Sequence, residues 1–187
     1  RAVAEQVAVR FEEYYPPFDI WFEVHAFPSR TGLSVLFQDI NARRRTEEEL
    51  RKLSRAVEQS PSTVVITDLA GNIEYANPKF NQTTGYTLDE AIGQNPRILK
   101  SGELSSEGYK ELWDAVTAGR EWRGEFHNKR KNGELYWESA SISPIRDSSG
   151  KITHFLAVKE DITARKQAEE SIKKLNQRLE SRAIELN

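Results

Sequence analysis

The sequence predicts an α+β protein in which an antiparallel five-stranded sheet, with small helices on one face, is flanked by amphipathic helices. Three observations support this fold class. Residues 59–163 follow the order two strands, several helices and three further strands. Charged segments with helical periodicity flank this unit at residues 42–58 and 164–187. Finally, residues 38–53 recur as residues 160–175 with eight of the sixteen positions identical, so one strand-to-helix junction is expected twice.

The first segment, residues 1–41, contains three short apolar stretches at residues 7–14, 20–27 and 32–39. Aromatic and β-branched residues dominate them, and turns with proline or glycine separate them, which is typical of antiparallel strands. Three strands alone make a thin core. We therefore expect this segment to be the C-terminal end of a domain whose earlier part precedes residue 1.

Residues 42–58 are expected to form a helical linker. Thr46, Leu50, Leu53 and Val57 follow spacings of four, three and four, which place them along one face of an α-helix. A Ser-Pro-Ser sequence then ends the pattern.

The central unit, residues 59–163, begins with an apolar hairpin and continues with short helices. The Asn77-Pro78 pair predicts an N-cap followed by proline in the first turn of one helix. The sequence from Thr87 to Glu90 is a capping box that starts a second helix.

A longer helix and three strands complete this unit. The helix is expected over residues 105–118, with Gly119 beyond its end. Strands are expected at residues 122–129, 135–145 and 152–161, separated by glycine-containing turns.

Composition excludes several classes of function. The 187 residues are 37% hydrophobic and 30% charged, and the formal net charge of -2 provides no basic surface for a phosphate backbone, so no nucleic-acid partner is expected. The absence of cysteine removes disulfides, thiolate metal sites and cysteinyl photoadducts, and it fits a reducing, cytoplasmic compartment. No apolar run approaches the ~20 residues of a membrane span, so no direct membrane contact is expected.

Residues 53–163 also carry a series of short motifs. They are Ile66-Thr67-Asp68, Gly71-Asn72-Ile73, Tyr75-Ala76-Asn77, Thr84-Gly85-Tyr86, Gly93-Gln94-Asn95-Pro96-Arg97, Trp122-Arg123-Gly124-Glu125, Asn128-Lys129-Arg130-Lys131-Asn132-Gly133, Ser143-Pro144-Ile145 and Asp161-Ile162-Thr163. In this order they resemble the PAS domain, a small sensor module of bacterial signalling proteins. The resemblance implies a sensing and dimerising domain without catalytic activity of its own, upstream of a histidine kinase or a cyclic-dinucleotide enzyme.

The two junctions share the Asp-Ile pair of this family's C-terminal motif. In the first segment the pair is Asp39-Ile40, and at the end of the complete domain it is Asp161-Ile162, followed by Thr163. We expect these residues to anchor a continuous strand-to-helix connection through which a signal leaves the sheet.

Strand alternation selects candidate residues for an internal pocket. If Asn128 faces the interior, Trp122 lies on the same side, and the matching register places Glu138 and Lys159 inside. Asn95 and Arg97 are added by the resemblance, because with Asn128 they match positions through which LOV-type photosensors, a PAS subclass, contact a flavin.

The flavin interpretation is restricted by other positions. Pro96 stands where the photoactive cysteine would be, and Glu138 and Lys159 stand where those photosensors carry amides. Light-driven adduct chemistry is therefore excluded. The resemblance leaves a redox flavin, FAD, like that of nitrogen-fixation and methane-oxidation sensors, whose Asn-Pro-Arg and Trp-x-Gly-like stretches look similar.

Two alternatives remain open. Glu138 can form a structural ion pair with Lys159 or Arg97, and buried charges are paired more often than they are functional. The domain is then a dimerising relay without a cofactor. Haem is not expected, because haem-binding PAS sensors commonly use a histidine on the long helix and residues 105–118 contain none.

The outer surfaces predict a homodimer. We expect apolar outer faces at Leu156 and Val158 of the complete domain and at Val24, Leu33 and Val35 of the first segment, and such faces need a cover. The C-terminal helix, residues 164–187, is expected to form a parallel coiled coil through Ile172, Leu175, Leu179 and Leu186. It would lead into an output domain of the same chain, with a histidine kinase as the first expectation.

Overall fold

The computed structural model describes residues 7–103 and 106–185, and the chain divides into two compact units, Arg1–Arg55 and Ala56–Asn187. Leu186 of the expected coiled-coil seam lies outside the described residues.

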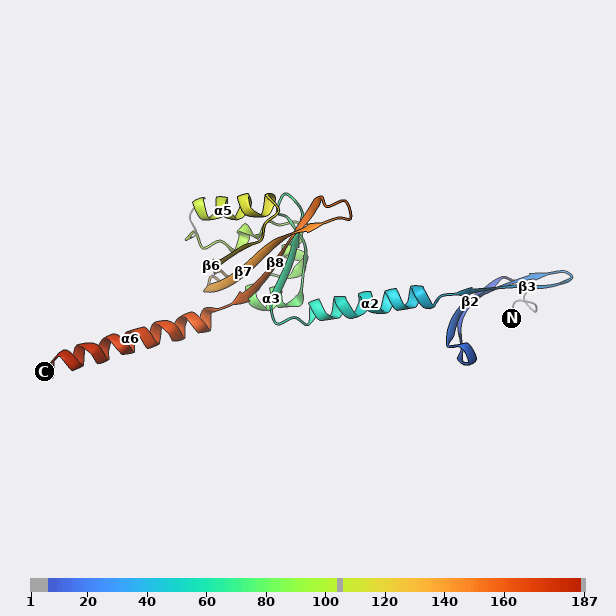
Figure 1. Ribbon diagram of the computed structural model, residues 1–187, viewed down its shortest axis with the longest axis horizontal. Helices are drawn as coiled ribbons and strands as arrows, with labels where there is room; N and C mark the ends of the chain where they lie inside the picture. The colour runs from blue at the N-terminus through green and yellow to red at the C-terminus, as the bar shows by residue number, and fades with distance from the viewer. Residues whose placement is uncertain (1–6, 104–105, 186–187) are drawn as a thin grey trace. The chain divides into compact units, whose positions relative to one another are not determined.

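The C-terminal unit is built on an antiparallel five-stranded sheet in the order β5-β4-β8-β7-β6, and helix α5 lies along one face of it (Figure 1). Its elements are β4 (Thr63–Thr67), β5 (Ile73–Ala76), α3 (Pro78–Thr84), α4 (Leu88–Ala91), the 3-10 helix η2 (Pro96–Leu99), α5 (Ser106–Thr117), β6 (Trp122–Lys129), β7 (Leu135–Arg146), β8 (Ile152–Asp161) and α6 (Thr163–Glu185). The predicted fold class is confirmed.

The sheet buries one face against these helices. Alternate side chains of β6, β7 and β8 point to this inner face, as the strand period requires. Leu112 and Val116 of α5 pack against Phe126 and Phe155, and Phe80 of α3 packs with the inner residues of β4 and β5. The core therefore lies between the sheet and the helices that connect β5 to β6.

Two predicted helix starts have different outcomes. The capping box is present, since Thr87 and Glu90 each bond to the other's backbone N–H. Pro78 starts α3, but the side chain of Asn77 does not cap it. Asn77 is fully buried and instead accepts from the backbone N–H of Val64 (2.9 Å) and donates to the carbonyls of Val57 and Ser62 (3.0 Å each). These long-range bonds outcompete the local cap.

The N-terminal unit contains a three-stranded antiparallel sheet in the order β1-β2-β3. Its elements are β1 (Val9–Tyr15), the 3-10 turn η1 (Pro16–Phe18), β2 (Ile20–Ser29), β3 (Gly32–Asp39) and the start of helix α2 (Asn41–Glu58). Phe11, Leu33 and Phe37 on this sheet are 48%, 46% and 65% exposed.

The two junctions give both sheets a common register. Val35 lies four residues before its junction aspartate, as the buried Ala157 does in the C-terminal unit, so both point to the same side of their sheets. Leu33 shares this side, and so does Val24, which pairs with Phe37. Of the three residues expected on an outer face, Leu33 and Val35 are exposed and Val24 is buried. Counted from the junction aspartate, their strand positions match the inner side of the C-terminal unit.

The predicted apolar outer position at Val158 and the predicted helix seams are exposed. Val158 is 39% exposed, and the predicted helix seams are open, with Leu50 at 62% and Leu175 at 57%. None of the helices in the described ranges has the length and apolar character that crossing a bilayer demands.

Candidate ligand cavity and helix junction

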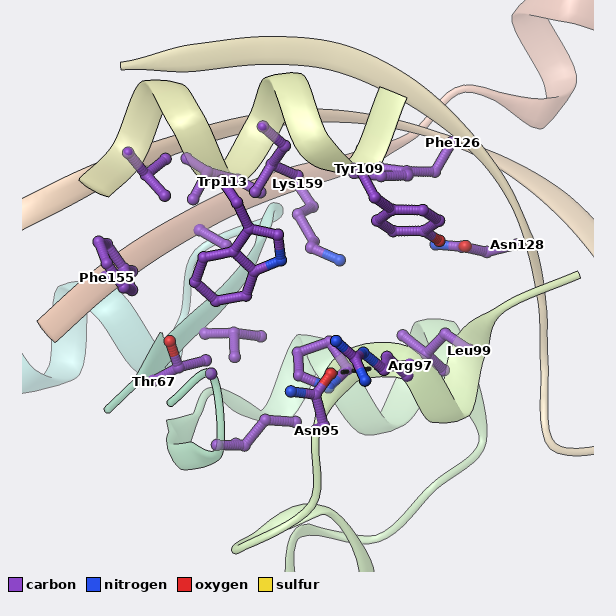
Figure 2. Close-up of a pocket in the computed structure, with 18 of the residues that line it drawn as sticks. Thr67, Asn95, Arg97, Leu99, Tyr109, Trp113, Phe126, Asn128, Phe155 and Lys159 are labelled. Atoms are coloured by element: carbon purple, nitrogen blue, oxygen red, sulfur yellow. Dashed lines mark hydrogen bonds between the residues drawn. The ribbon is translucent and has the colours of Figure 1, made fainter. Parts of the chain in front are cut away.

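The C-terminal unit encloses a cavity of about 110 Å³ between the inner face of the sheet, α5 and η2. Its wall is mainly aromatic and aliphatic, with Trp113 and Tyr109 contributed by α5. The polar groups on the wall are Thr67, Asn95, Arg97, Asn128 and Lys159. Figure 2 shows that the Lys159 ammonium and the Trp113 indole extend into the same space.

The polar end of the cavity is organised by Glu138. Its side chain is 1% exposed, and its Oε2 accepts from the Lys159 ammonium at 2.8 Å and from the Asn128 amide at 3.0 Å. Oε1 accepts from the Tyr136 hydroxyl at 3.4 Å. Because a buried charge is costly when it is unpaired, this arrangement holds Lys159 in its inward rotamer.

Tyr136 is held in the protonated form. Burial raises the pKa of the Tyr136 phenol far above its usual value, and the neighbouring charge of Glu138 raises that pKa further. The hydroxyl therefore stays a donor toward Glu138 at all physiological pH values.

Glu138 lies behind the residues that form the cavity wall. It does not line the cavity itself and reaches it through Lys159 and Asn128. The structure pairs Glu138 with Lys159, and Arg97 lies exposed at the rim instead. In the described part of the chain, Glu138 is the one hydrogen-bond partner of the Lys159 ammonium, which carries three N–H groups.

Asn95 shapes the rim next to Arg97. Its Oδ1 accepts from the backbone N–H of Arg97 at 3.1 Å and so caps η2 (Figure 2). Gly71 closes the same rim in a left-handed conformation with φ of 85°. A Cβ at Gly71 would lie 3.0 Å from both the Asn95 amide nitrogen and the Trp113 ring, so the backbone approaches this closely only with glycine.

Trp122 does not reach the cavity. Its ring packs against Phe126, with ring centroids 5.1 Å apart, and lies directly over Gly124. The tryptophan that lines the cavity is Trp113 of α5. Its ring packs edge-on against Phe155, with ring centroids 5.8 Å apart. Trp113, Tyr109 and Thr67 also line the cavity and were not among the predicted site residues. The spacing of four between the two aromatic residues on α5 is the signal that the sequence offers for them.

None of the three histidines is among the described residues that line the cavity. Each is paired with a glutamate: His25 with Glu23, His127 with Glu103 and His154 with Glu74. Across residues 7–103 and 106–185, no group of three or more His, Asp or Glu side chains is placed to hold a metal ion.

The junction at the end of β8 is a closed set of hydrogen bonds. Asp161 Oδ1 accepts from the backbone N–H (2.9 Å) and the hydroxyl (2.6 Å) of Thr163, and its Oδ2 accepts from Arg130 at 2.6 Å. The Thr163 hydroxyl oxygen also accepts from the Trp137 N–H at 2.9 Å. Ile162 is 3% exposed, and its N–H donates to the Trp137 carbonyl. Helix α6 thus continues directly from the strand (Figure 1).

Asp161 is held in its ionised form. Burial acts to raise the pKa of this carboxyl, but the hydrogen bonds from Thr163 and Arg130 outweigh it, so the pKa is lower than usual.

The first junction repeats this arrangement. Asp39 accepts from the Asn41 N–H at 2.8 Å, and Ile40 is 2% exposed and donates its N–H to the Trp21 carbonyl. The Asn41 side chain takes the place of the threonine and accepts from the Trp21 N–H at 3.0 Å.

Comparison with known proteins agrees with this fold. A family model described as PAS domain matches residues 61–164, more than half of the chain. The nitrogen fixation regulatory protein of Klebsiella oxytoca is 39% identical over 107 residues, 57% of this chain and 22% of that protein. A blue-light-activated histidine kinase of Brucella anthropi is 32% identical over 119 residues, 62% of this chain and 24% of that protein. The chain therefore spans less than a quarter of either relative's length.

A solved structure supports the same assignment. The PAS domain of a protein from Colwellia psychrerythraea superposes with a TM-score of 0.58 and 27% sequence identity, covering 62% of this chain and 98% of that one. Since the family model, the relatives and the strand order all agree, the chain belongs to the PAS domain family, and its complete unit is a sensory domain related to signal-transduction regulators and histidine kinases.

Proposed function

We propose that the C-terminal unit senses the state of its cavity and relays it through α6 to an output domain of the same chain. The observation that carries this proposal is the position of two residues on one strand. Lys159 stands in the cavity wall, and Asp161, two residues later on β8, holds the first turn of α6. A small displacement of β8 is therefore passed to the helix without an intervening loop.

The relay is tested in the full-length protein. Asp161→Ala removes the acceptor that joins Thr163 and Arg130, and we expect the output to lose most of its response to the stimulus. Asp114→Ala, on the exposed side of α5, is the matched control and should respond normally. A normal response of a folded Asp161→Ala protein would contradict the relay.

For the ligand, we propose FAD, with the isoalloxazine ring in the cavity. Asn128 and Lys159 would hold the polar edge of the ring, Trp113 its face, and Asn95 and Arg97 the phosphate side. Bound FAD would supply redox chemistry, and Glu138 would adjust its hydrogen bonds to the charge of the ring edge. The donor set fits this group, but a volume of about 110 Å³ is below the ~300–1,000 Å³ of ordinary ligand clefts, so the cavity would have to enlarge on binding.

The second candidate is a dimerising relay without a cofactor. The Glu138–Lys159 pair and the small cavity favour it, because the two buried charges neutralise each other without a ligand. The absorption spectrum of freshly purified protein separates the two candidates, since a flavin absorbs near ~450 nm. Asn128→Leu should remove this band, whereas Asn132→Leu, in an exposed turn, should keep it. A colourless wild-type protein would contradict the FAD proposal and favour the relay.

We propose a homodimer that works in the cytoplasm, with a histidine kinase as the output domain and a cyclic-dinucleotide enzyme as the alternative. The histidine kinase among the relatives supports the first output. The exposed apolar seams of α2 and α6 support pairing of the signalling helices.

We also propose that the first segment, residues 1–41, carries the C-terminal strands of another PAS domain that precedes the complete one. Their register matches β6–β8, and their exposed apolar face corresponds to the face that α3 and α5 cover in the complete unit. A helical layer from the preceding part of the parent protein would cover it. Adding those residues should lower the fluorescence of the apolar dye ANS on this chain, and an unchanged signal would contradict the assignment.

A further inference from the structure

A tryptophan on the outer face of each sheet contacts the first turn of the helix that leaves it. In the C-terminal unit, the ring of Trp137 stacks on His127, with centroids 4.5 Å apart and planes at 12°. The Lys166 ammonium lies 5.1 Å from the centre of the same ring. The backbone of Trp137 is bonded to Ile162 and Thr163 as described above, so its ring and its main chain both contact the start of α6.

A carboxylate on the neighbouring strand fixes the lysine over the ring. Glu125 of β6 lies beside Trp137 on the outer face and accepts from Lys166 at 2.5 Å. Arg165 approaches the same carboxylate at 3.5 Å. The indole face and the carboxylate therefore hold the basic residue from two sides.

The N-terminal unit contains the same contacts. The Arg44 guanidinium lies 4.0 Å from the centre of the Trp21 ring, and Tyr14 packs on that ring at 5.4 Å. Glu12 accepts from Arg44 and from Arg43, both at 2.6 Å. Tyr14 pairs with Trp21 as His127 pairs with Trp137, so the two clusters occupy equivalent strand positions.

The tryptophans lie outside the repeated sixteen-residue segment, and the spacing to them differs. Trp21 precedes Asp39 by 18 residues, and Trp137 precedes Asp161 by 24 residues. The cluster thus recurs in space although the connection between the last two strands has changed length.

Two points of attachment are needed to fix the direction of a helix. The hydrogen bonds of Asp161 and Thr163 attach the first turn of α6 at a single point, the end of β8. Lys166 lies one turn further along α6, so its contact with the ring and the carboxylate supplies the second point.

We propose that Trp137 and Trp21 are positioning residues that set the direction in which α6 and α2 leave their sheets, by holding the basic residue of the first helical turn. We call the cluster of tryptophan, basic residue and carboxylate the indole clasp. The proposal rests on the proposed relay only for its use in signalling; the geometry it predicts belongs to this chain alone.

The test follows the direction of α6 through the distance between two spin labels, measured by pulsed electron paramagnetic resonance. The chain has no cysteine, so Asp89→Cys on α4 and Arg178→Cys on α6, both exposed, can be labelled specifically. We expect Trp137→Leu to broaden the distance distribution at least twofold, and Trp137→Phe, which keeps an aromatic face, to broaden it less. An unchanged distribution in a folded Trp137→Leu protein would overturn the proposal.

A second pair of variants keeps the test valid if Trp137→Leu fails to fold. Lys166→Gln removes the cation and should also broaden the distribution, whereas Lys166→Arg should restore the wild-type width. Lys174→Gln removes an ion pair of α6 that touches no aromatic ring and should change nothing. Equal widths for Lys166→Gln and Lys174→Gln would contradict the clasp. Because neither cofactor nor output is measured, these results are independent of whether the proposed relay is correct.

Discussion

At the residue scale, burial makes the ion pair of Glu138 and Lys159 sensitive to the loss of either partner. Removing one partner leaves the other charge buried, which costs about 3–5 kcal/mol, whereas an apolar pair of similar volume can be neutral. We expect Lys159→Met and Glu138→Leu each to lower the free energy of unfolding by about this amount. The double variant should be more stable than either single one. Urea unfolding measures all three, and strictly additive losses would contradict a direct pair.

Asp161 makes the stability of the junction depend on pH. Its pKa is lower in the folded than in the unfolded chain, so its ionised form stabilises the fold above the unfolded value of ~3.9, and the effect is lost as the pH falls through the folded value. We expect Asp161→Asn to reduce stability at pH 7 and the difference from wild type to shrink below about pH 4. Asp114→Asn should match wild type throughout. A difference that stays constant with pH would mean that the charge of Asp161 is not responsible.

Once Asn128 is taken to face the interior, strand alternation and register are enough to place Glu138 and Lys159 on the same face, and all three side chains are buried. Alternation failed for Trp122, since parity gives the side of the sheet and not the distance from the cavity. The spacing of four between Tyr109 and Trp113 places both on the apolar face of α5, but it does not tell which residues of that face line the cavity and which only pack in the core.

At the scale of elements, the β4–β5 turn depends on Gly71. Its φ of 85° disfavours any other residue, and a Cβ would press on Asn95 and Trp113 at 3.0 Å. We expect Gly71→Ala to lose about 1–3 kcal/mol of stability beyond the cost of the backbone conformation alone. Gly133→Ala is the matched control, because its φ is 90° and nothing lies within 4 Å of the added carbon. Thermal unfolding compares the two, and equal losses would rule out a close contact at the rim.

The repeat predicted both strand-to-helix junctions because each is encoded in a short continuous segment. The helices begin at Asn41 and Thr163, one residue earlier than expected, because these polar side chains serve the junction from inside the first turn. The role of Asn77 was not predictable from its neighbours, since all three of its partners are backbone groups of other segments. Local sequence patterns determine where helices and strands begin. The hydrogen-bond partners of an individual side chain also depend on backbone groups that are distant in the sequence.

At the scale of the whole molecule, the proposed homodimer depends on the apolar seam of α6. Ile172, Leu175 and Leu179 are 61%, 57% and 56% exposed, and each leucine buried in a helix pair contributes about 1.5–3 kcal/mol. We therefore expect Leu175→Gln with Leu179→Gln to convert the dimer to a monomer at micromolar concentration, as measured by sedimentation velocity. Lys173→Gln with Lys174→Gln changes exposed polar positions of the same helix that lie off the seam and should leave the dimer intact. A dimer that survives the leucine substitutions must be held elsewhere, and the partly exposed Val158 on the outer face of the sheet is then the next position to substitute.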